Sequence, residues 1–202
     1  MRFIKKTHYN QDIQLFKHQG QLFWYGALSI ALLLSPLVLS DFYLGELSLV
    51  FIYAIAGIGL MLLTGYTGLV SLGHAAFLAI GAYTHAYLLA QGWPFPASIV
   101  CATLLSSLIG AIIGIPALRM TGIYLAVATL AFAIIVEQVL SHWVSVTGGF
   151  RGMAVEPPSI GSISLDDSVT FYLLCLFILT GCLFLALNLL RTPIGRAMTA
   201  IR

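Results

Sequence analysis

The sequence predicts an all-α membrane protein, a polytopic bundle of about six transmembrane helices whose N-terminus faces the cytoplasm. Of its 202 residues, 60% are hydrophobic and only 8% are charged, and the mean hydropathy is +1.01. This balance excludes a water-soluble domain of the same length. Long apolar runs divide the chain, each close to the ~20 residues that cross a bilayer as a helix. None of them shows the alternating pattern of membrane strands.

Six apolar runs are expected to span the membrane: residues 22–39, 47–63, 69–90, 97–115, 122–140 and 169–190. The expected connections are short and include residues 41–46, 91–96 and 116–121. Residues 1–20 form a basic, polar segment ahead of the first span. That span is too long for a signal-peptide core and is followed by no convincing small-residue cleavage site, so we expect it to be retained.

Basic residues set the expected orientation, because they collect on the cytoplasmic side of short loops. With the N-terminus inside, eight of the nine Lys and Arg residues fall on that side, and only Arg151 falls outside. The cytoplasmic set is Arg2, Lys5, Lys6, Lys17, Arg119, Arg191, Arg196 and Arg202. Topology therefore accounts for the net charge of +2, and nucleic acid is not implied as a partner.

Residues 65–85, GYTGLVSLGHAAFLAIGAYTH, gather glycine, small residues, hydroxyls and histidine in an otherwise apolar chain. Small side chains let membrane helices approach closely. One stripe at three- and four-residue steps comprises Ser71, Ala75, Ala79, Ala82 and Ala86, and a second comprises Ser106, Gly110 and Gly114. We expect close helix packing at Gly65, Gly68, Gly73, Ala75, Ala79, Gly81, Gly110 and Gly114.

No metal site or cofactor is expected. His74 and His85 are eleven residues apart and would share one helical face, but no acidic or cysteine ligand joins them on that helix. Hydrogen-bonded interior histidines are therefore expected. The cysteines, Cys101, Cys175 and Cys182, match no metal motif and are expected to pack as small apolar side chains.

Glu137 is the only acidic residue inside a predicted span. Ionisable groups within the membrane mark functional paths or pair with a neighbour. Because Glu137 lies about one turn from the outer end of its helix, both a role in the substrate path or gate and structural pairing stay open.

The stretch from Thr147 to Met153, TGGFRGM, opens the longest outer loop. It joins the adjacent Gly148 and Gly149 to an aromatic residue and to Arg151. Such a stretch folds back toward the membrane, presents backbone amides to an anion, or moves freely, and the sequence does not choose among these.

Four ordered motifs resemble one family. GYTGLVSLGHAAFLAIGAYT, LRMTGIYLAVATLAF, TGGFRGM and RTPIGRAMTAIR occur in the order and at the separations seen in bacterial permease subunits of branched-chain amino-acid ABC importers. The resemblance covers residues 47–202. It extends to the related urea and short-chain amide permeases, which share all four motifs.

The resemblance implies a non-enzymatic transport subunit of the bacterial inner membrane. Its implied partners are a second permease subunit, two ATP-binding cassette subunits and a periplasmic substrate-binding protein, besides membrane lipid. The chain itself lacks the GxxxxGK[ST] loop that would bind ATP. ATP hydrolysis is therefore expected to reside in the partner subunits.

The same resemblance implies two functional regions. The translocation path would lie between the two permease subunits, and its candidate lining is Thr67, Ser71, His74, Tyr83, Tyr124, Thr129 and Glu137. The contact with the ATPase would begin at residues 191–202, with Arg191, Gly195, Arg196, Ala197 and Arg202. Residues 21–190 are then the transmembrane domain.

Members of the family continue beyond this point, so the chain is expected to be a partial permease. Branched-chain amino acids are the favoured substrates, with urea or a short-chain amide as the alternative. An ion-coupled secondary carrier would need no ATPase. A membrane enzyme would need a catalytic constellation, which the scattered His74, His85, His142 and Glu137 do not form.

Overall fold

A computed structural model describes residues 19–117, 119–120, 122–155, 159–160, 163–164 and 167–201. Arg202 and the basic residues of the first eighteen positions lie outside this part. The elements are α2 (Gln19–Val38), α3 (Asp41–Leu60), the π-helix η1 (Met61–Tyr66), α4 (His74–Ala90), α5 (Phe95–Ala117), α6 (Ile123–His142), α7 (Val144–Thr147), the 3₁₀-helix η2 (Gly149–Arg151), β1 (Ser159–Ile160), β2 (Ile163–Ser164), α8 (Ser168–Arg191) and α9 (Pro193–Ile201).

The all-α membrane bundle is confirmed, but its helices are unequal. Within the described residues, four segments are long and apolar enough to cross a membrane: Asp41–Tyr66, Phe95–Ala117, Ile123–His142 and Ser168–Arg191. The apolar part of α2 is shorter, at Phe23–Val38, and α4 has 17 residues. In the described part of the chain, the strands form only a two-residue antiparallel hairpin, in which Ser159 pairs with Ser164.

Two predicted boundaries are wrong. Residues 41–46, expected as a connection, form the start of α3, because α2 ends at Val38 and only Leu39 and Ser40 separate the two helices. Asp41 in the first turn suits the partial positive charge of a helix N-terminus. The expected span 69–90 is also interrupted, since residues 67–73 are not helical and α4 begins at His74.

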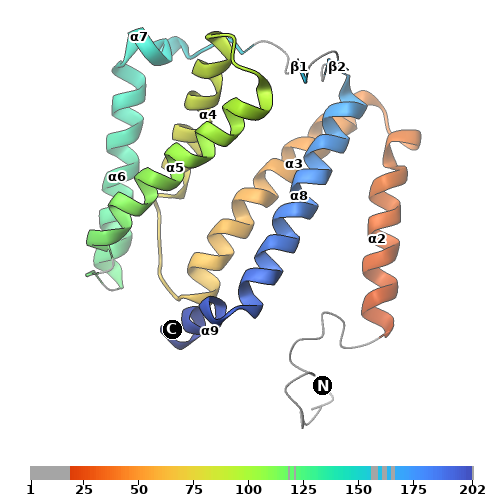
Figure 1. Cartoon of the computed structure of the whole chain (residues 1–202), viewed down its shortest axis with the longest axis horizontal. Coiled ribbons are helices and arrows are strands. Elements are labelled where there is room, and N and C mark those ends of the chain that lie inside the picture. Colours follow the sequence, from red (N-terminus) through yellow and green to blue (C-terminus); the bar gives the residue numbers. More distant parts are fainter. Residues whose placement is uncertain are drawn as a thin grey trace.

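The helices form two groups (Figure 1). In the first, α3 packs along α8, with α2 at its edge; in the second, α4 packs against α5 and α6. The α5–α6 connection, which holds Arg119, and α9 lie at one end of the bundle, whereas the η2 region and the strand hairpin lie at the other. The three described arginines expected inside therefore share one end, opposite Arg151.

The core of the first group lies between α3 and α8. Leu44 and Phe51 of α3 pack with Tyr172, Cys175 and Leu176 of α8, and all five are buried. The Phe51 and Tyr172 rings are 5.2 Å apart between centroids, in the range where aromatic pairs contribute about 0.5–1.5 kcal/mol beyond area burial.

Tyr172 also holds α2. Its side chain is fully buried, and its hydroxyl donates to the Leu32 carbonyl at 3.0 Å and lies 2.8 Å from Ser35 Oγ. Leu32 of α2, and Leu39 just after its end, pack against the same core. The attachment of α2 is thus concentrated in its C-terminal half.

Removing the Tyr172 hydroxyl tests this attachment. We expect Tyr172→Phe to lower the free energy of unfolding by about 0.5–1.5 kcal/mol, because the bond to α2 is lost while the ring contact with Phe51 stays. The measurement is thermal unfolding of the purified protein in detergent. Tyr53→Phe is the matched control, since Tyr53 is 65% exposed on α3; equal effects of the two changes would contradict the proposed attachment.

Candidate functional site

A break in the helical backbone connects the two groups of helices. The α-helical pattern of α3 ends at Leu60, η1 continues to Tyr66, and residues 67–73 are not helical. Gly68 has a φ of 71°, a conformation that glycine adopts without strain. Figure 1 shows this connection rising from the end of α3 near α9 to the start of α4. Residues 61–73 are called the broken segment below.

Hydroxyl groups satisfy backbone carbonyls within the broken segment. Thr64 Oγ1 donates to the Leu60 carbonyl at 2.8 Å, and Thr67 Oγ1 donates to the Leu63 carbonyl. Non-helical backbone at membrane depth is tolerated only where its polar groups find protein or water partners. The threonines of this stretch therefore serve local backbone bonding.

Thr129 of α6 fixes the far end of the broken segment. The Leu72 amide donates to Thr129 Oγ1 at 3.0 Å. Gly73 is buried, and a Cβ at that position would lie 2.7 Å from the Thr129 carbonyl oxygen. Only glycine permits this approach, so residues 72–73 are held directly against the backbone of α6.

His74 ties the start of α4 to α3. Its Nε2 lies 3.0 Å from the Ala56 carbonyl oxygen, and its ring would be 3.3 Å from a Cβ placed on Gly59. Gly59 was not among the predicted packing positions, although a glycine in the middle of an apolar span was a visible signal of close approach. The end of the broken segment is thus held to α6 at Thr129, and His74, the residue that follows the segment, is held to α3.

The second histidine of α4 has a different neighbour. His85 Nδ1 lies 2.8 Å from Ser98 Oγ of α5, and Ser98 is fully buried and donates to the Phe95 carbonyl. His74 therefore contacts α3, whereas His85 contacts α5. Within the described residues, no group of three or more His, Cys, Asp or Glu side chains could hold a metal ion.

Small residues bring α4 and α5 together at several of the expected positions. A Cβ on Gly81 would lie 3.3 Å from Ser106 Oγ, and one on Gly110 would lie 3.5 Å from the Phe77 ring. Ser106 Oγ also donates to the Phe77 carbonyl at 3.3 Å. By contrast, a Cβ on Gly114 would meet nothing within 4 Å.

The remaining packing candidates do not form the expected stripe. Ser71 lies before α4 begins, so the predicted helical stripe cannot start there. Ala75 is exposed and Ala79 is half-buried. Gly65 is exposed, and a Cβ there would lie 3.6 Å from Met61 Cγ.

Only some of the residues predicted to line the translocation path lie close together. Ser71 Oγ accepts a long bond from the Gly73 amide at 3.4 Å, so Ser71 lies beside the Thr129 contact. Tyr83 lies nine residues beyond His74, half a turn around α4. Tyr124 is 76% exposed at the start of α6, and Glu137 is exposed near its end. Neither belongs to the Thr129 contact.

The stretch from Thr147 to Met153 folds back on the end of α6. Thr147 is 1% exposed; its Oγ1 donates to the Trp143 carbonyl at 2.8 Å and accepts from the Gly149 amide at 3.2 Å. A Cβ on Gly148 would lie 2.3 Å from the Gly152 oxygen, and both residues have positive φ. Arg151 projects as an exposed residue at this end of the bundle.

Helix α9 packs against α8 at the opposite end of the bundle. Gly195 of α9 is buried, and a Cβ there would lie 2.5 Å from the Leu190 Cα and carbonyl oxygen of α8. Helix α9 also contacts η1, as its position beneath α3 and α8 in Figure 1 shows. Arg191, Arg196 and Ala197 are exposed around this junction. The helix that carries the expected ATPase-facing residues Gly195, Arg196 and Ala197 therefore contacts the broken segment.

Known proteins are similar to this chain over the regions described above. A family model described as the permease component of branched-chain amino acid transport systems covers residues 42–202. The chain is 33% identical, over 201 aligned positions, to the high-affinity branched-chain amino acid transport system permease protein LivM of Escherichia coli (strain K12), and equally to that of Salmonella typhimurium (strain LT2). Each alignment covers 87% of this chain and 47% of the relative.

The chain thus spans about half the length of the curated relatives it matches. No solved structure matches it. The family model includes the broken segment, the 147–153 turn and α9 within one continuous match. On this evidence, the chain belongs to the family of permease components of branched-chain amino acid transport systems.

Proposed function

We propose that this multi-pass inner-membrane protein acts in a permease subunit of an ATP-driven importer that carries leucine, isoleucine and valine across the inner membrane. The observation that carries the proposal is the family match over residues 42–202, which includes both the broken segment and α9. The name of the LivM relatives supports branched-chain amino acids over urea or amides.

The proposed assembly contains a second permease subunit, two ATP-binding cassette subunits and a periplasmic substrate-binding protein. In it, the N-terminus and α9 face the cytoplasm, since Arg119, Arg191 and Arg196 lie at one end of the bundle. Arg151 then faces the periplasm. Exposed residues of α9, with Arg191 and Arg196, would meet the ATP-binding subunits.

The contacts of α9 suggest how ATP hydrolysis would reach the transport path. Helix α9 docks on α8 at Gly195 and touches η1. The broken segment then leads to the contacts of Leu72 and Gly73 with Thr129 and to the bond of His74 with α3. A displacement of α9 would thereby change the position of α4 relative to α3 and α6, as alternating access requires.

The proposed path is lined by Thr67, Ser71, His74, Tyr83, Tyr124, Thr129 and Glu137. The cluster of Ser71, His74 and Thr129 supports this assignment best, because these residues surround the point where the helical backbone is interrupted. Interrupted helices are a recurring location of substrate paths in transporters.

Substrate and energy source are tested together by uptake into cells with and without the intact locus. We expect deletion to abolish ATP-dependent uptake of labelled leucine, because the permease forms half of the translocation path. Labelled urea is the parallel substrate. Loss of urea uptake alone would reassign the permease to the amide branch. If leucine uptake is lost only when the proton gradient is collapsed, and not when ATP is depleted, the result would contradict an ATP-driven importer.

Docking of α9 is tested by Gly195→Ala. The added methyl group would meet the Leu190 backbone at 2.5 Å, and overpacking of this kind costs about 1–3 kcal/mol. We expect leucine uptake to fall roughly tenfold, with unchanged protein abundance in the membrane. The control is Gly181→Ala in α8, where a Cβ would meet nothing within 4 Å. Equal uptake by the two variants would refute a role for the α9 contact.

The link to α6 is tested by Thr129→Val, which leaves the Leu72 amide without its acceptor. An unsatisfied amide costs about 1–3 kcal/mol, so we expect amide hydrogen exchange across residues 67–73 to accelerate about tenfold or more. Thr103→Val is the control, because the Thr103 hydroxyl bonds only within its own exposed helix turn. Unchanged exchange in Thr129→Val would show that Gly73 alone holds the segment.

A further inference from the structure

Helix α2 contains a proline that deprives one carbonyl of its helical partner. Pro36 lies two residues before the end of α2. Proline has no amide hydrogen, and its ring crowds the carbonyl four residues earlier. The Leu32 carbonyl therefore has no amide of its own helix to accept from at position 36. In the membrane interior such a carbonyl needs another donor, because water does not reach it.

Two hydroxyl groups meet this carbonyl. Tyr172 of α8 donates to the Leu32 carbonyl at 3.0 Å. Ser35 Oγ lies 2.9 Å from the same oxygen and 2.8 Å from the Tyr172 hydroxyl. The acceptor that joins α2 to α8 is therefore the one that Pro36 makes available. Leu32, Ser35, Pro36 and Tyr172 are called the latch below.

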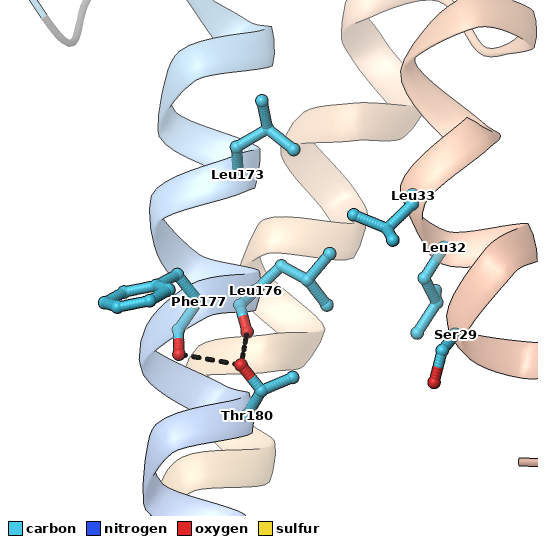
Figure 2. A pocket seen from close by; sticks show the side chains of 7 residues that line it. All are labelled: Ser29, Leu32, Leu33, Leu173, Leu176, Phe177 and Thr180. Atoms are coloured by element: carbon cyan, nitrogen blue, oxygen red, sulfur yellow. Dashed lines mark hydrogen bonds between the residues drawn. The ribbon is translucent and has the colours of Figure 1, made fainter. Parts of the chain in front are cut away.

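The N-terminal half of α2 is loosely placed beside α8. Between Phe23 and Ala31, every residue except Ala27 is exposed. A groove with a volume of about 400 Å³ lies between the two helices, and Figure 2 shows Ser29 and Leu33 across it from side chains of α8. The described contacts between the two helices are thus concentrated at the latch.

A short connection next to the latch has the properties of a hinge. Helix α2 ends at Val38 and α3 begins at Asp41, so two residues connect them. Hinges consist of a few residues at the ends of elements, which absorb the change in φ and ψ. Leu39 packs against the core around Tyr172, which holds the α3 side in place. The start of α2, at the opposite end of that helix, lies on the side of the bundle where α9 lies (Figure 1).

From these contacts we infer that α2 is a hinged helix with two positions, one latched on α8 through the Leu32 carbonyl and one swung away from α8 on residues 39–40. In the swung position Ser35 still donates to the Leu32 carbonyl, because that bond lies within one helix turn. The carbonyl is therefore paired in both positions. The cost of unlatching falls mainly on the Tyr172 hydroxyl, which loses its partners on α2.

Distances between spin labels in the whole protein, reconstituted in lipid bilayers, test the hinge. Nitroxides are attached to a genetically encoded ketone amino acid, so the native cysteines stay in place. One pair joins Trp24 of α2 to Leu185 of α8, and the control pair joins Tyr53 of α3 to Leu185; these residues are 73%, 69% and 65% exposed in the order Trp24, Leu185, Tyr53. We expect two distances for the α2–α8 pair and a single narrow one for the α3–α8 pair, since α3 packs along α8.

Tyr172→Phe tests the donor of the latch. Loss of one hydrogen bond should raise the ratio of the swung to the latched population roughly threefold to tenfold. Tyr43→Phe is the matched control, because Tyr43 is 58% exposed on α3, and it should leave the ratio unchanged. The distance of the α3–α8 pair verifies that each variant keeps the fold of the larger group.

Pro36→Ala tests the origin of the acceptor. The new amide at position 36 donates to the Leu32 carbonyl within α2, so the carbonyl no longer depends on an outside donor. We expect Tyr172→Phe, added to Pro36→Ala, to change the ratio less than about twofold, because two changes that act on one bond are not additive.

Three outcomes would overturn the inference. A single distance for the α2–α8 pair, as narrow as that of the α3–α8 pair, would remove the hinge. A ratio that Tyr172→Phe leaves unchanged would remove the latch, and an equal effect of Tyr172→Phe with and without Pro36 would show that the proline does not create the acceptor. These distances are measured without substrate or ATP, so failure of the proposed function would not affect them.

Discussion

The close approach of Gly73 to Thr129 is the constraint on which the arrangement of the second helix group depends. A polypeptide that leaves helical geometry within a membrane must still pair its amides and carbonyls. The Leu72 amide does so on Thr129 Oγ1, and Gly73 lets the two backbones come close enough for that bond. Because α4 starts directly after this point, this hydroxyl and this missing side chain help to set its position relative to α6.

Buried glycines allow close approach at three separate contacts in the bundle. A Cβ on the buried Gly73 or Gly195 would collide with neighbouring backbone, and one on the buried Gly149 would press against the Val144 side chain and the Ser141 oxygen. In a membrane, where burial of apolar surface gives little advantage to helix contacts, such approaches supply much of the packing. The apolar core around Tyr172 is instead built from large side chains.

Much of this fold could be predicted from the sequence, because apolar length alone identifies helices such as α5, α6 and α8. The interruption before His74 could not, since residues 69–73 are as apolar and small as the helix that follows. What distinguishes them is a tertiary bond to Thr129, 57 residues away. Thr129 and His74 were recognisable as polar residues in apolar spans, whereas their partners, a carbonyl of Ala56 and an amide of Leu72, carry no sequence signal. Tyr172 was missed although it is a polar aromatic residue in a long apolar run.

The one-sided attachment of α2 has a consequence for the response to bilayer thickness. A transmembrane helix adjusts to a thicker or thinner membrane mainly by changing its tilt, at a modest energetic cost for each ångström of mismatch. Helix α8 is packed along α3 and cannot tilt alone, whereas α2 is free to pivot about its contacts with Tyr172. Membranes of different thickness should therefore alter the angle between α2 and α8 and leave the two larger groups of helices unchanged.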